Sequence, residues 1–338
     1  MEKVVYSNLG SSSRAILVGP KKGEDNAVIS LGGDRVMILT VDPVSIIPAV
    51  GIEQSAWMSV HLVASDYATS GMLPQYATFS FNFPPRLGLR ERRHYIASIG
   101  AECRELGITI AAGHTGSYPG SDFTVIGACS MFGFANRGEF VETSMARPGD
   151  AIMMTKEAAI ETTASLASSF PRWVEAQVGR RLASRARKLG GRCSTVADSV
   201  AASRIGLGPK GVTSMHDATE GGVIGGLSEM AFASGTAFSV LTKSIPVSRV
   251  AAAVCGAFGL DPLRSLSEGT LLITCNHSRV GDLTEELLDA DIPVARIGTV
   301  KRGEGLWSDD RSGKPSRLKV GKDRYWDVYR EASECGLR

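Results

Sequence analysis

The chain has 338 residues, a length typical of about two domains. Its 37 Lys and Arg residues against 35 Asp and Glu residues leave a formal net charge of +2, which argues against a nucleic-acid-binding protein that works through a basic surface. Hydrophobic residues make up 43% and charged residues 21%, as in an ordinary globular enzyme. The six cysteines form no CxxC pair, so their spacing gives neither a zinc ribbon nor a disulfide framework.

The sequence also indicates no membrane segment. The first ten residues contain no apolar run after their charges, which argues against a signal peptide. The longest uncharged stretches, 67–85 and 123–136, are interrupted by Gly, Asn, Ser or Pro and make poor membrane spans. We therefore expect a cytoplasmic protein with neither a membrane nor a nucleic-acid partner.

The first half of the chain predicts alternating short strands and helices. Ile52, Trp57, Val63 and Tyr67 recur at helical spacing and predict a helix with one buried face. A second amphipathic helix is predicted to end at Gly107. The predicted strands are 14–18, 36–41, 76–83, 108–112 and 123–134, and the predicted helices are 52–67 and 90–106.

The turn cluster Arg147–Asp150 precedes a fresh apolar strand and predicts a domain boundary, giving domains 1–147 and 148–338. In the second half we predict strands at 151–155, 270–275 and 294–300, and helices at 162–169, 173–189, 194–205 and 223–233. The polar segment 301–322 is typical of a surface hairpin or loop. Because strands and helices intermix without a regular βαβ rhythm, we expect α+β domains with mixed or antiparallel sheets rather than a Rossmann sheet.

Acidic residues at the ends of apolar segments are the main chemical signal. The sequence has no P-loop, no dinucleotide-binding glycine motif, no GxSxG serine elbow and no HExxH motif. Converging carboxylates are hard oxygen ligands of the kind that Mg²⁺ takes beside phosphate. Taken singly, each of these residues is more often a helix cap or a turn former. The acidic residues in question are Glu24, Asp25, Asp42, Asp66, Asp217 and Glu220.

Two glycine-flanked segments strengthen this signal. The segment 217–222 opens a predicted helix, and the backbone N–H groups of a helix start form a natural anion site. The segment 112–116 follows a predicted strand and carries His114, for which a core position is an equally good interpretation.

Six segments in order, 23–29, 41–43, 60–71, 112–115, 217–222 and 267–273, together resemble the aminoimidazole-ribonucleotide (AIR) synthase-like superfamily. Within it the chain is most similar to the E-type hydrogenase expression/formation branch and its archaeal AIR synthase-related cousins. The resemblance implies a two-domain α+β fold of the PurM-like type. In that fold an N-terminal mixed or antiparallel sheet forms a barrel in a homodimer, and the C-terminal domain is an α/β sandwich.

The resemblance also implies an ATP site without a P-loop, in the cleft between the domains, with Mg²⁺ as cofactor. It implies catalytic roles for Asp66, His114 and Lys156, and metal ligation by Asp25, Asp42, Asp66 and Asp217. The residues implied in nucleotide binding are Glu24, Asp25, Asp42, Gly113, Thr115, Glu161, Asp217, Gly221 and Gly222.

The shared chemistry of the superfamily is ATP-dependent phosphorylation of an amide-type oxygen. In the hydrogenase-maturation branch the acceptor is a carboxamide on the protein's own terminal cysteine, and other maturation proteins are partners. This sequence departs from the branch at three points. Its last residues are Cys335-Gly-Leu-Arg instead of Pro-Arg-Ile-Cys, and Ala112 and Ser65 replace a usual glycine and asparagine. We expect Cys335 to be a helix-packing cysteine.

Other interpretations stay open. A non-catalytic paralogue would keep the fold as a nucleotide-binding scaffold. A small-molecule kinase or ligase of the superfamily, similar to thiamine-monophosphate kinase or to AIR synthase, is a further alternative. Selenophosphate synthetase fits less well because it needs a reactive cysteine near the start, whereas the first cysteine here is Cys103. The basic run 180–188 is interpreted as a solvated helix face.

Overall fold

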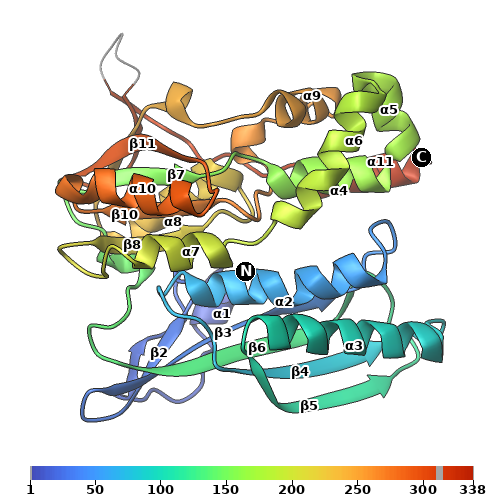
Figure 1. Ribbon diagram of the computed structural model, residues 1–338, viewed down its shortest axis with the longest axis horizontal. Coiled ribbons are helices and arrows are strands. Elements are labelled where there is room, and N and C mark those ends of the chain that lie inside the picture. Colours follow the sequence, from blue (N-terminus) through green and yellow to red (C-terminus); the bar gives the residue numbers. More distant parts are fainter. Residues whose placement is uncertain (1, 310–314, 338) are drawn as a thin grey trace.

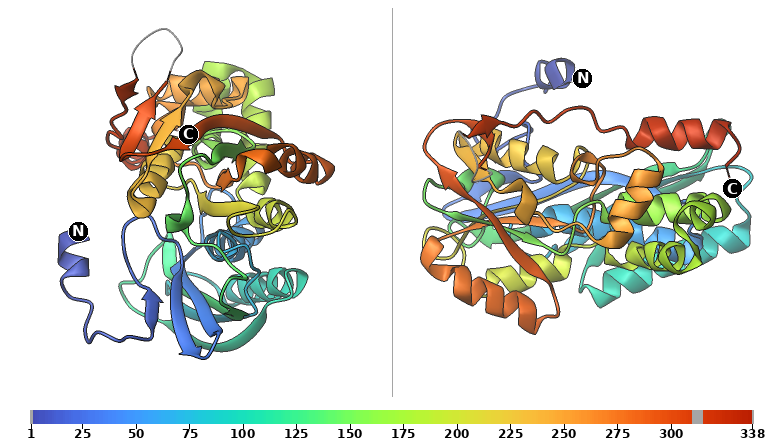
Figure 2. Two further views of the ribbon diagram at one scale, coloured as in Figure 1. Left: turned by 90° about the vertical axis from the view of Figure 1, so that its left-hand side faces the viewer. Right: turned by 90° about the horizontal axis from the view of Figure 1, so that it is seen from above.

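The computed structural model describes residues 2–309 and 315–337. It contains two sheets stacked one above the other, with helices between and around them (Figure 1). The N-terminal helix α1 (Glu2–Tyr6) stands away from the body in both further views (Figure 2). Among the described residues, no helix has the length and apolar character needed to cross a bilayer.

The N-terminal sheet has six strands in the order β1-β2-β3-β6-β4-β5. Neighbouring strands pair antiparallel except β4 and β5, which are parallel, so the sheet is mixed as the sequence predicts. The strands are β1 (Ile16–Val18), β2 (Ala27–Gly32), β3 (Arg35–Ser45), β4 (Tyr76–Phe83), β5 (Thr109–Ser117) and β6 (Val125–Asn136).

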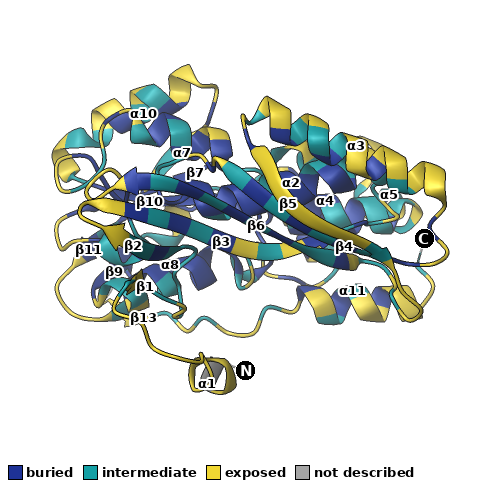
Figure 3. Cartoon of the chain, turned by 90° about the horizontal axis from the view of Figure 1, so that it is seen from below, coloured by how far each residue is buried: buried dark blue, intermediate teal, exposed yellow. Residues whose placement is uncertain are grey.

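Helices α2 (Ile52–Ala68) and α3 (Leu89–Glu105) cover one face of this sheet (Figure 1). Strand β4 alternates strictly, with Phe79, Phe81 and Phe83 buried against the helices. No helix within residues 2–309 or 315–337 covers the opposite face, which is seen directly in Figure 3. One face of the sheet therefore builds the N-terminal core, and the other stays open in the single chain.

The C-terminal sheet has seven strands in the order β13-β12-β9-β11-β7-β10-β8. Helix α8 packs on one face, and helices α7 and α10 pack on the other. The strands are β7 (Ala151–Thr155), β8 (Val212–Asp217), β9 (Ala237–Val240), β10 (Leu271–Cys275), β11 (Val294–Lys301), β12 (Gly305–Ser308) and β13 (Ser316–Arg317). The three helices are α7 (Val196–Ser203), α8 (Gly222–Ser234) and α10 (Val280–Asp289).

A separate helical cluster with its own apolar core flanks this sheet. It consists of α4 (Ile160–Ser169), α5 (Pro171–Val178), α6 (Arg180–Lys188), α9 (Arg249–Ala257) and α11 (Tyr325–Glu334). The sequence predicts a single helix over 173–189, but the structure divides this segment into α5 and α6 at Gly179. There the backbone φ is +83°, a left-handed value that favours glycine and ends the first helix.

Several other predictions can be compared with the structure. The strand predicted at 108–112 runs on to Ser117, and the predicted hairpin within 301–322 is the β12–β13 pair, whose segment 310–314 lies outside the described residues. The turn Arg147–Asp150 lies between the last strand of the first sheet and the first strand of the second. The exact boundary at residue 147 stays a prediction.

Helix α2 connects the two halves, because it packs on the N-terminal sheet below and lies against the C-terminal domain above (Figure 1). Its position is held by a buried hydrogen-bond network. The Tyr95 hydroxyl of α3 donates to Ser59 Oγ of α2 at 2.8 Å. Ser59 Oγ in turn accepts from the N–H of Ser45 at 3.0 Å and donates to its carbonyl at 3.1 Å. Two helices and strand β3 are thereby fixed to one another.

We predict that Tyr95→Phe lowers the free energy of unfolding by about 1–2 kcal/mol, because it removes one buried hydrogen bond and leaves the ring in place. Urea denaturation measures the change. Tyr6→Phe, on the exposed helix α1, is the matched control and should alter stability by less than about 0.5 kcal/mol. Equal effects of the two variants would contradict the role assigned to this network.

Candidate functional site

A cavity of about 410 Å³ lies between the two domains. Strand β3 and helix α2 form much of its N-terminal wall, and the other wall comes from the loop after β8, the loop before β10 and helices α4 and α11. We call it the carboxylate cavity. Its acidic lining residues are Glu24, Asp25, Asp42, Asp66, Glu161, Glu220 and Glu268, and Trp326 of α11 also borders it.

Burial and mutual repulsion raise the pKa of most of these carboxyl groups. Burial raises the pKa of Asp42 to about 7, and nearby Glu220 adds to the effect. Burial also raises the pKa of Glu161 to about 8, again with Glu220 contributing. The pKa values of Asp66 and Glu268 are well above their usual range, first through burial and then through the charge of Asp217.

Asp217 lies at the end of strand β8, behind the cavity wall. Both of its carboxylate oxygens are buried and have no hydrogen-bond partner among the described residues. Burial, followed by the charge of Asp25, raises the pKa of Asp217 to about 7. One oxygen of Glu161 and one of Glu268 are buried and unpartnered in the same way. Leaving such buried acceptors unpaired costs free energy unless a ligand binds to them.

His216 supplies a positive charge on one side of the cluster. Its Nδ1 lies 2.8 Å from one Asp25 oxygen and 2.9 Å from the other, and its Nε2 lies 3.3 Å from Glu229. These two carboxylates outweigh burial and raise the pKa of His216 well above its usual range. The raised pKa favours the imidazolium form, in which both ring nitrogens donate and His216 orients Asp25.

Glu24 is already engaged by the protein. Its side-chain oxygens accept from the N–H groups of Thr143 and Ser144 at 3.2 and 2.9 Å, and Lys21 lies 3.2 Å away. The Glu24 side chain is only 3% exposed. Although Glu24 borders the cavity, its carboxylate fixes the segment that leads into the second domain.

The glycines at the start of helix α8 are required by close packing. A Cβ atom at Gly222 would lie 2.6 Å from the carbonyl oxygen of Ser265, and its φ is +61°. The N–H of Gly221 donates to a carboxylate oxygen of Asp323 at 2.9 Å. The anion-binding position predicted at this helix start is thus filled by a carboxylate of the chain itself.

Gly113, His114 and Thr115 are not brought to the carboxylate cavity within one chain. They lie in the middle of strand β5, at the edge of the N-terminal sheet. His114 is exposed, and its Nε2 lies 2.7 Å from the hydroxyl of Tyr118. The structure therefore places His114 neither in the core nor beside Asp66.

Lys156 also lies outside the lining of the carboxylate cavity. It borders a different cavity, of about 490 Å³, which we call the rear cavity. There its Nζ lies 3.0 Å from a carboxylate oxygen of Asp198. Of the three side chains implied as catalytic, the carboxylate cavity contains only Asp66.

Cys335 corrects a further expectation. It is exposed at the end of α11, whereas the buried side chains of that helix are those of Tyr325, Val328 and Ala332. Cys335 is therefore not a helix-packing cysteine. The one-sided pattern of this helix simply ends before the cysteine is reached.

Sequence analysis did not single out His216, Glu229 or Glu268 as site residues. Glu268 is part of one of the six segments on which the resemblance rests, and His216 directly precedes Asp217. A polar His-Asp pair at the end of a buried strand was the available signal.

The residues of this cavity fit a divalent cation. Several buried carboxylates with raised pKa values lie near one another, namely Asp42, Asp66, Asp217, Glu161 and Glu268. The nearby protein cation, His216, is already shared by Asp25 and Glu229. Carboxylate oxygens are the hard ligands that Mg²⁺ prefers. The unpartnered oxygens of Asp217 are the structural sign of a missing positive charge.

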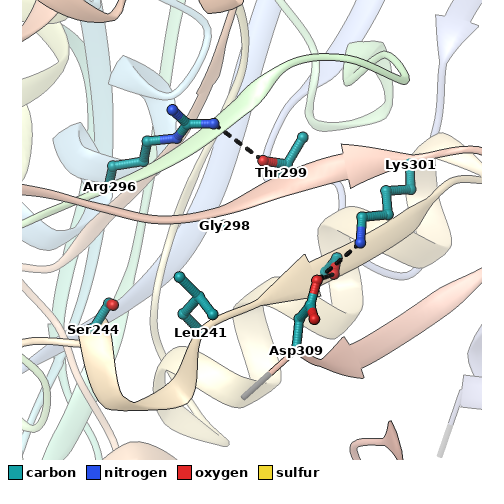
Figure 4. Close-up of a pocket in the computed structure, with 8 residues that line it drawn as sticks. Leu241, Ser244, Arg296, Gly298, Thr299, Lys301 and Asp309 are labelled. Atoms are coloured by element: carbon teal, nitrogen blue, oxygen red, sulfur yellow. Dashed lines mark hydrogen bonds and ion pairs between the residues drawn. The ribbon is translucent and has the colours of Figure 1, made fainter. Parts of the chain in front are cut away.

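A third cavity, of about 500 Å³, differs in its charge balance. It lies over strands β9 and β11 of the C-terminal sheet (Figure 4). Lys301 is paired with Asp309 at 2.9 Å, and Arg296 donates to the hydroxyl of Thr299 at 3.2 Å. Two basic side chains and one carboxylate line this cavity, so it lacks the excess of negative charge that marks the carboxylate cavity.

Comparison with known proteins gives one family match in each half of the chain. Residues 23–135 match the N-terminal domain of the AIR synthase related protein family, and residues 147–307 match its C-terminal domain. The chain belongs to the AIR synthase related protein family. The resemblance predicted from the six segments is thereby confirmed.

Curated members of this family include proteins of hydrogenase maturation. The chain is 29% identical to the carbamoyl dehydratase HypE of Rhizobium leguminosarum bv. viciae, over 75% of this chain and 69% of that protein. It is 24% identical to a putative hydrogenase expression/formation protein of Methanocaldococcus jannaschii, over 81% of this chain and 77% of that protein.

Solved structures confirm the two-domain PurM-like fold of this AIR synthase related chain. E. coli HypE superposes with a TM-score of 0.71 at 21% identity, covering 84% of this chain and 85% of that one. The thiamine-monophosphate kinase-type structure AaThiL, complexed with AMPPCP and TMP, gives a TM-score of 0.70 at 20% identity, covering 93% and 94%. At these identities the likeness shows the fold alone.

We predict that the metal-free protein loses stability as the pH rises from about 6.5 to 8.5. Raised carboxyl pKa values mean that the folded state holds protons that the unfolded state has released, so stability falls as pH rises through the folded values of about 7 to 8. The raised pKa of His216 acts in the same direction. The expected loss is on the order of 2–4 kcal/mol, measured by urea denaturation with a chelator present.

Millimolar Mg²⁺ should remove most of this slope, because a bound cation replaces the protons. Burial lowers the pKa of His61 to about 4, whereas its ordinary value is 6.5. Above pH 6.5 this histidine is therefore largely uncharged in both the folded and the unfolded state, and it adds little to the slope in the chosen pH window. A metal-free protein whose stability rises over this window would contradict the account of the cluster.

Proposed function

We propose that this AIR synthase related protein is a Mg²⁺- and ATP-dependent enzyme that phosphorylates an amide or carboxamide oxygen. The observation that carries the proposal is the buried carboxylate cluster, in which the part of the chain that the structure describes leaves both Asp217 oxygens without a partner. A cluster of this kind suits a metal–triphosphate complex better than it suits a free anionic nucleotide, which it would repel.

In the proposed reaction the acceptor oxygen forms a bond to the γ-phosphorus of ATP as the bond to the leaving ADP breaks. When bound, Mg²⁺ would supply the positive charge that neutralises the triphosphate and the transferring phosphoryl group. Asp25, Asp42, Asp66 and Asp217 would hold the metal. His216 keeps Asp25 in position, and α2 presents Asp66 from a rigid helix.

Structures of relatives support nucleotide binding by this fold. One neighbour is hydrogenase maturation protein HypE in complex with ATP, with a TM-score of 0.67. The AMPPCP and TMP complex of AaThiL supports a second candidate function, phosphorylation of a small molecule. We favour the amide acceptor because several curated relatives that match over about three quarters of the chain are carbamoyl dehydratases HypE.

We further propose a homodimer and a two-domain division at residues 147 and 148. The open face of the N-terminal sheet is seen in Figure 3. On this face Val41 is 61% exposed, and the rings of Tyr76 and Phe132 stack with their centroids 5.4 Å apart. A second copy would cover this apolar face. The structure of a HypE–HypF complex supports other maturation proteins as further partners.

We predict that calorimetry detects micromolar binding of ATP only when Mg²⁺ is present, and that Asp217→Asn abolishes it. The same substitution should stabilise the metal-free protein by on the order of 1–3 kcal/mol, because it removes one repelling charge. Asp34→Asn, at an exposed turn, is the control and should change neither quantity.

These two readouts separate the possible outcomes. A variant that is stabilised and no longer binds Mg²⁺–ATP supports the enzyme site. Absence of nucleotide binding in the unmodified protein would overturn the proposal and leave a fold kept as a scaffold. Binding without turnover of any amide acceptor would favour a nucleotide-binding paralogue.

We also predict that His114 reaches the nucleotide from the second copy of a dimer, since it lies away from the cavity in its own chain. Asp66→Asn and His114→Ala should each lose Mg²⁺–ATP binding alone. Random mixing of the two should restore about a quarter of the sites, because half of the dimers are mixed and each has one intact site. Calorimetric stoichiometry measures the recovery, and no recovery would contradict a shared site.

A further inference from the structure

The rear cavity borders a different face of helix α2 from the carboxylate cavity. Trp57 and His61 of α2 line it, while Met58, Leu62 and Asp66 line the other. Its opposite wall comes from the C-terminal domain, at the start of α7 and in the loops that flank β7 and β11. The rear cavity is thus a second space between the domains.

A buried ion pair in this cavity leaves a donor and an acceptor unused. Lys156 Nζ lies 3.0 Å from one oxygen of Asp198 and donates to the carbonyl of Ser194 at 2.7 Å. These side chains of Lys156 and Asp198 are 7% and 2% exposed. The other Asp198 oxygen is buried with no partner in the described chain, and no contact there accounts for the third N–H of Lys156.

The backbone around this pair is strained. Lys156 has a φ of +55° and Asp291 a φ of +57°, left-handed values that cost a non-glycine residue roughly 1–2 kcal/mol. Both residues line the rear cavity. The N–H of Lys156 also donates to the carbonyl of Pro293 at 2.6 Å, which holds its side chain in this position. Strain of this kind concentrates at ligand sites.

The stacked rings of Trp57 and His61 line one wall of the cavity. Trp57 and His61 have ring centroids 4.3 Å apart and an interplanar angle of 18°. His61 Nδ1 lies 3.1 Å from Ser194 Oγ, and Nε2 lies 3.4 Å from Glu102. Burial lowers the pKa of His61 to about 4, so the ring is uncharged at neutral pH. An uncharged ring can donate to Glu102 and accept from Ser194, which locks its orientation.

We propose that the rear cavity binds an uncharged ligand in which a primary amide or urea-type group is attached to a flat apolar ring. The free N–H of Lys156 matches the carbonyl of such a group, and the free oxygen of Asp198 matches its NH₂. The Trp57–His61 wall receives the ring. The charged residues that line the cavity are Lys156, Arg192, Asp198 and Asp291, whose charges sum to zero, so a charged ligand would leave an unbalanced charge beside the buried ion pair.

The test compares three ligands of similar shape: benzamide, benzoate and benzylamine. The geometry predicts binding of benzamide in the millimolar range by ligand-observed NMR, as is usual for a ligand of this size. Benzoate and benzylamine should bind at least about tenfold more weakly, because each brings a net charge. Equal or tighter binding of either charged ligand, or no binding of benzamide, would overturn the proposal.

Two variants locate the binding. The double substitution Lys156→Met with Asp198→Leu replaces a buried ion pair by apolar side chains, an exchange that proteins often tolerate, and should abolish benzamide binding. Ala197→Trp, at an exposed position that lines the cavity, should block it without altering the core. Ala101→Trp, exposed on α3, is the matched control and should leave binding unchanged.

The inference is independent of the proposed nucleotide chemistry. Ala197→Trp should retain the thermal shift caused by Mg²⁺–ATP while losing benzamide binding. Benzamide binding that survives in both Ala197→Trp and the double variant would place the ligand elsewhere and contradict the assignment. Benzamide binding in a protein that shows no Mg²⁺–ATP shift would leave the rear cavity assigned and reject only the proposed function.

Discussion

The repulsion among buried carboxylates is the constraint on which the rest of the site depends. Strand β3 delivers Asp42, helix α2 delivers Asp66 and strand β8 delivers Asp217 to one place between the domains. Each is desolvated there, and the charges of Asp217 and Asp42 add to the effect of burial in raising the pKa of Asp66. The domains can close around such a cluster only if protons or a cation neutralise it. The fold thereby couples its own stability to the binding of positive charge.

Helix α2 carries this coupling from one cavity to the other. One of its faces packs on the N-terminal sheet, and its remaining faces border both the carboxylate cavity and the rear cavity. Ser65 illustrates how closely the two are joined. Its hydroxyl accepts from the N–H of Thr195, next to the Ser194 that contacts His61, and Asp66 follows it directly in the chain. A shift of α2 at one cavity is therefore transmitted to the other cavity within a single helical turn.

Local sequence patterns predicted the fold class and the principal carboxylates, because the periodicity of an element and an acidic residue in it are both contained within one short segment of the chain. Asp42 and Asp66 interrupt apolar runs, and Asp217 ends one. The sequence does not reveal in which direction a side chain points or how far it lies from the site. The segment around His114 has the expected residues, but strand β5 extends through it and places it at a sheet edge. Lys156 adjoins a strand as expected, yet its left-handed backbone turns it into the rear cavity. His216 lay within a wholly buried strand, where no periodic pattern distinguishes it.

The most direct test of the central claim is a count of protons released when the protein binds Mg²⁺–ATP near pH 7. Calorimetry in two buffers that differ in ionisation enthalpy gives this number. Because several carboxyl groups hold protons in the metal-free state, the account predicts the release of about one proton or more per site. Binding with no proton release would mean that the cluster is already ionised without metal, and would contradict the account.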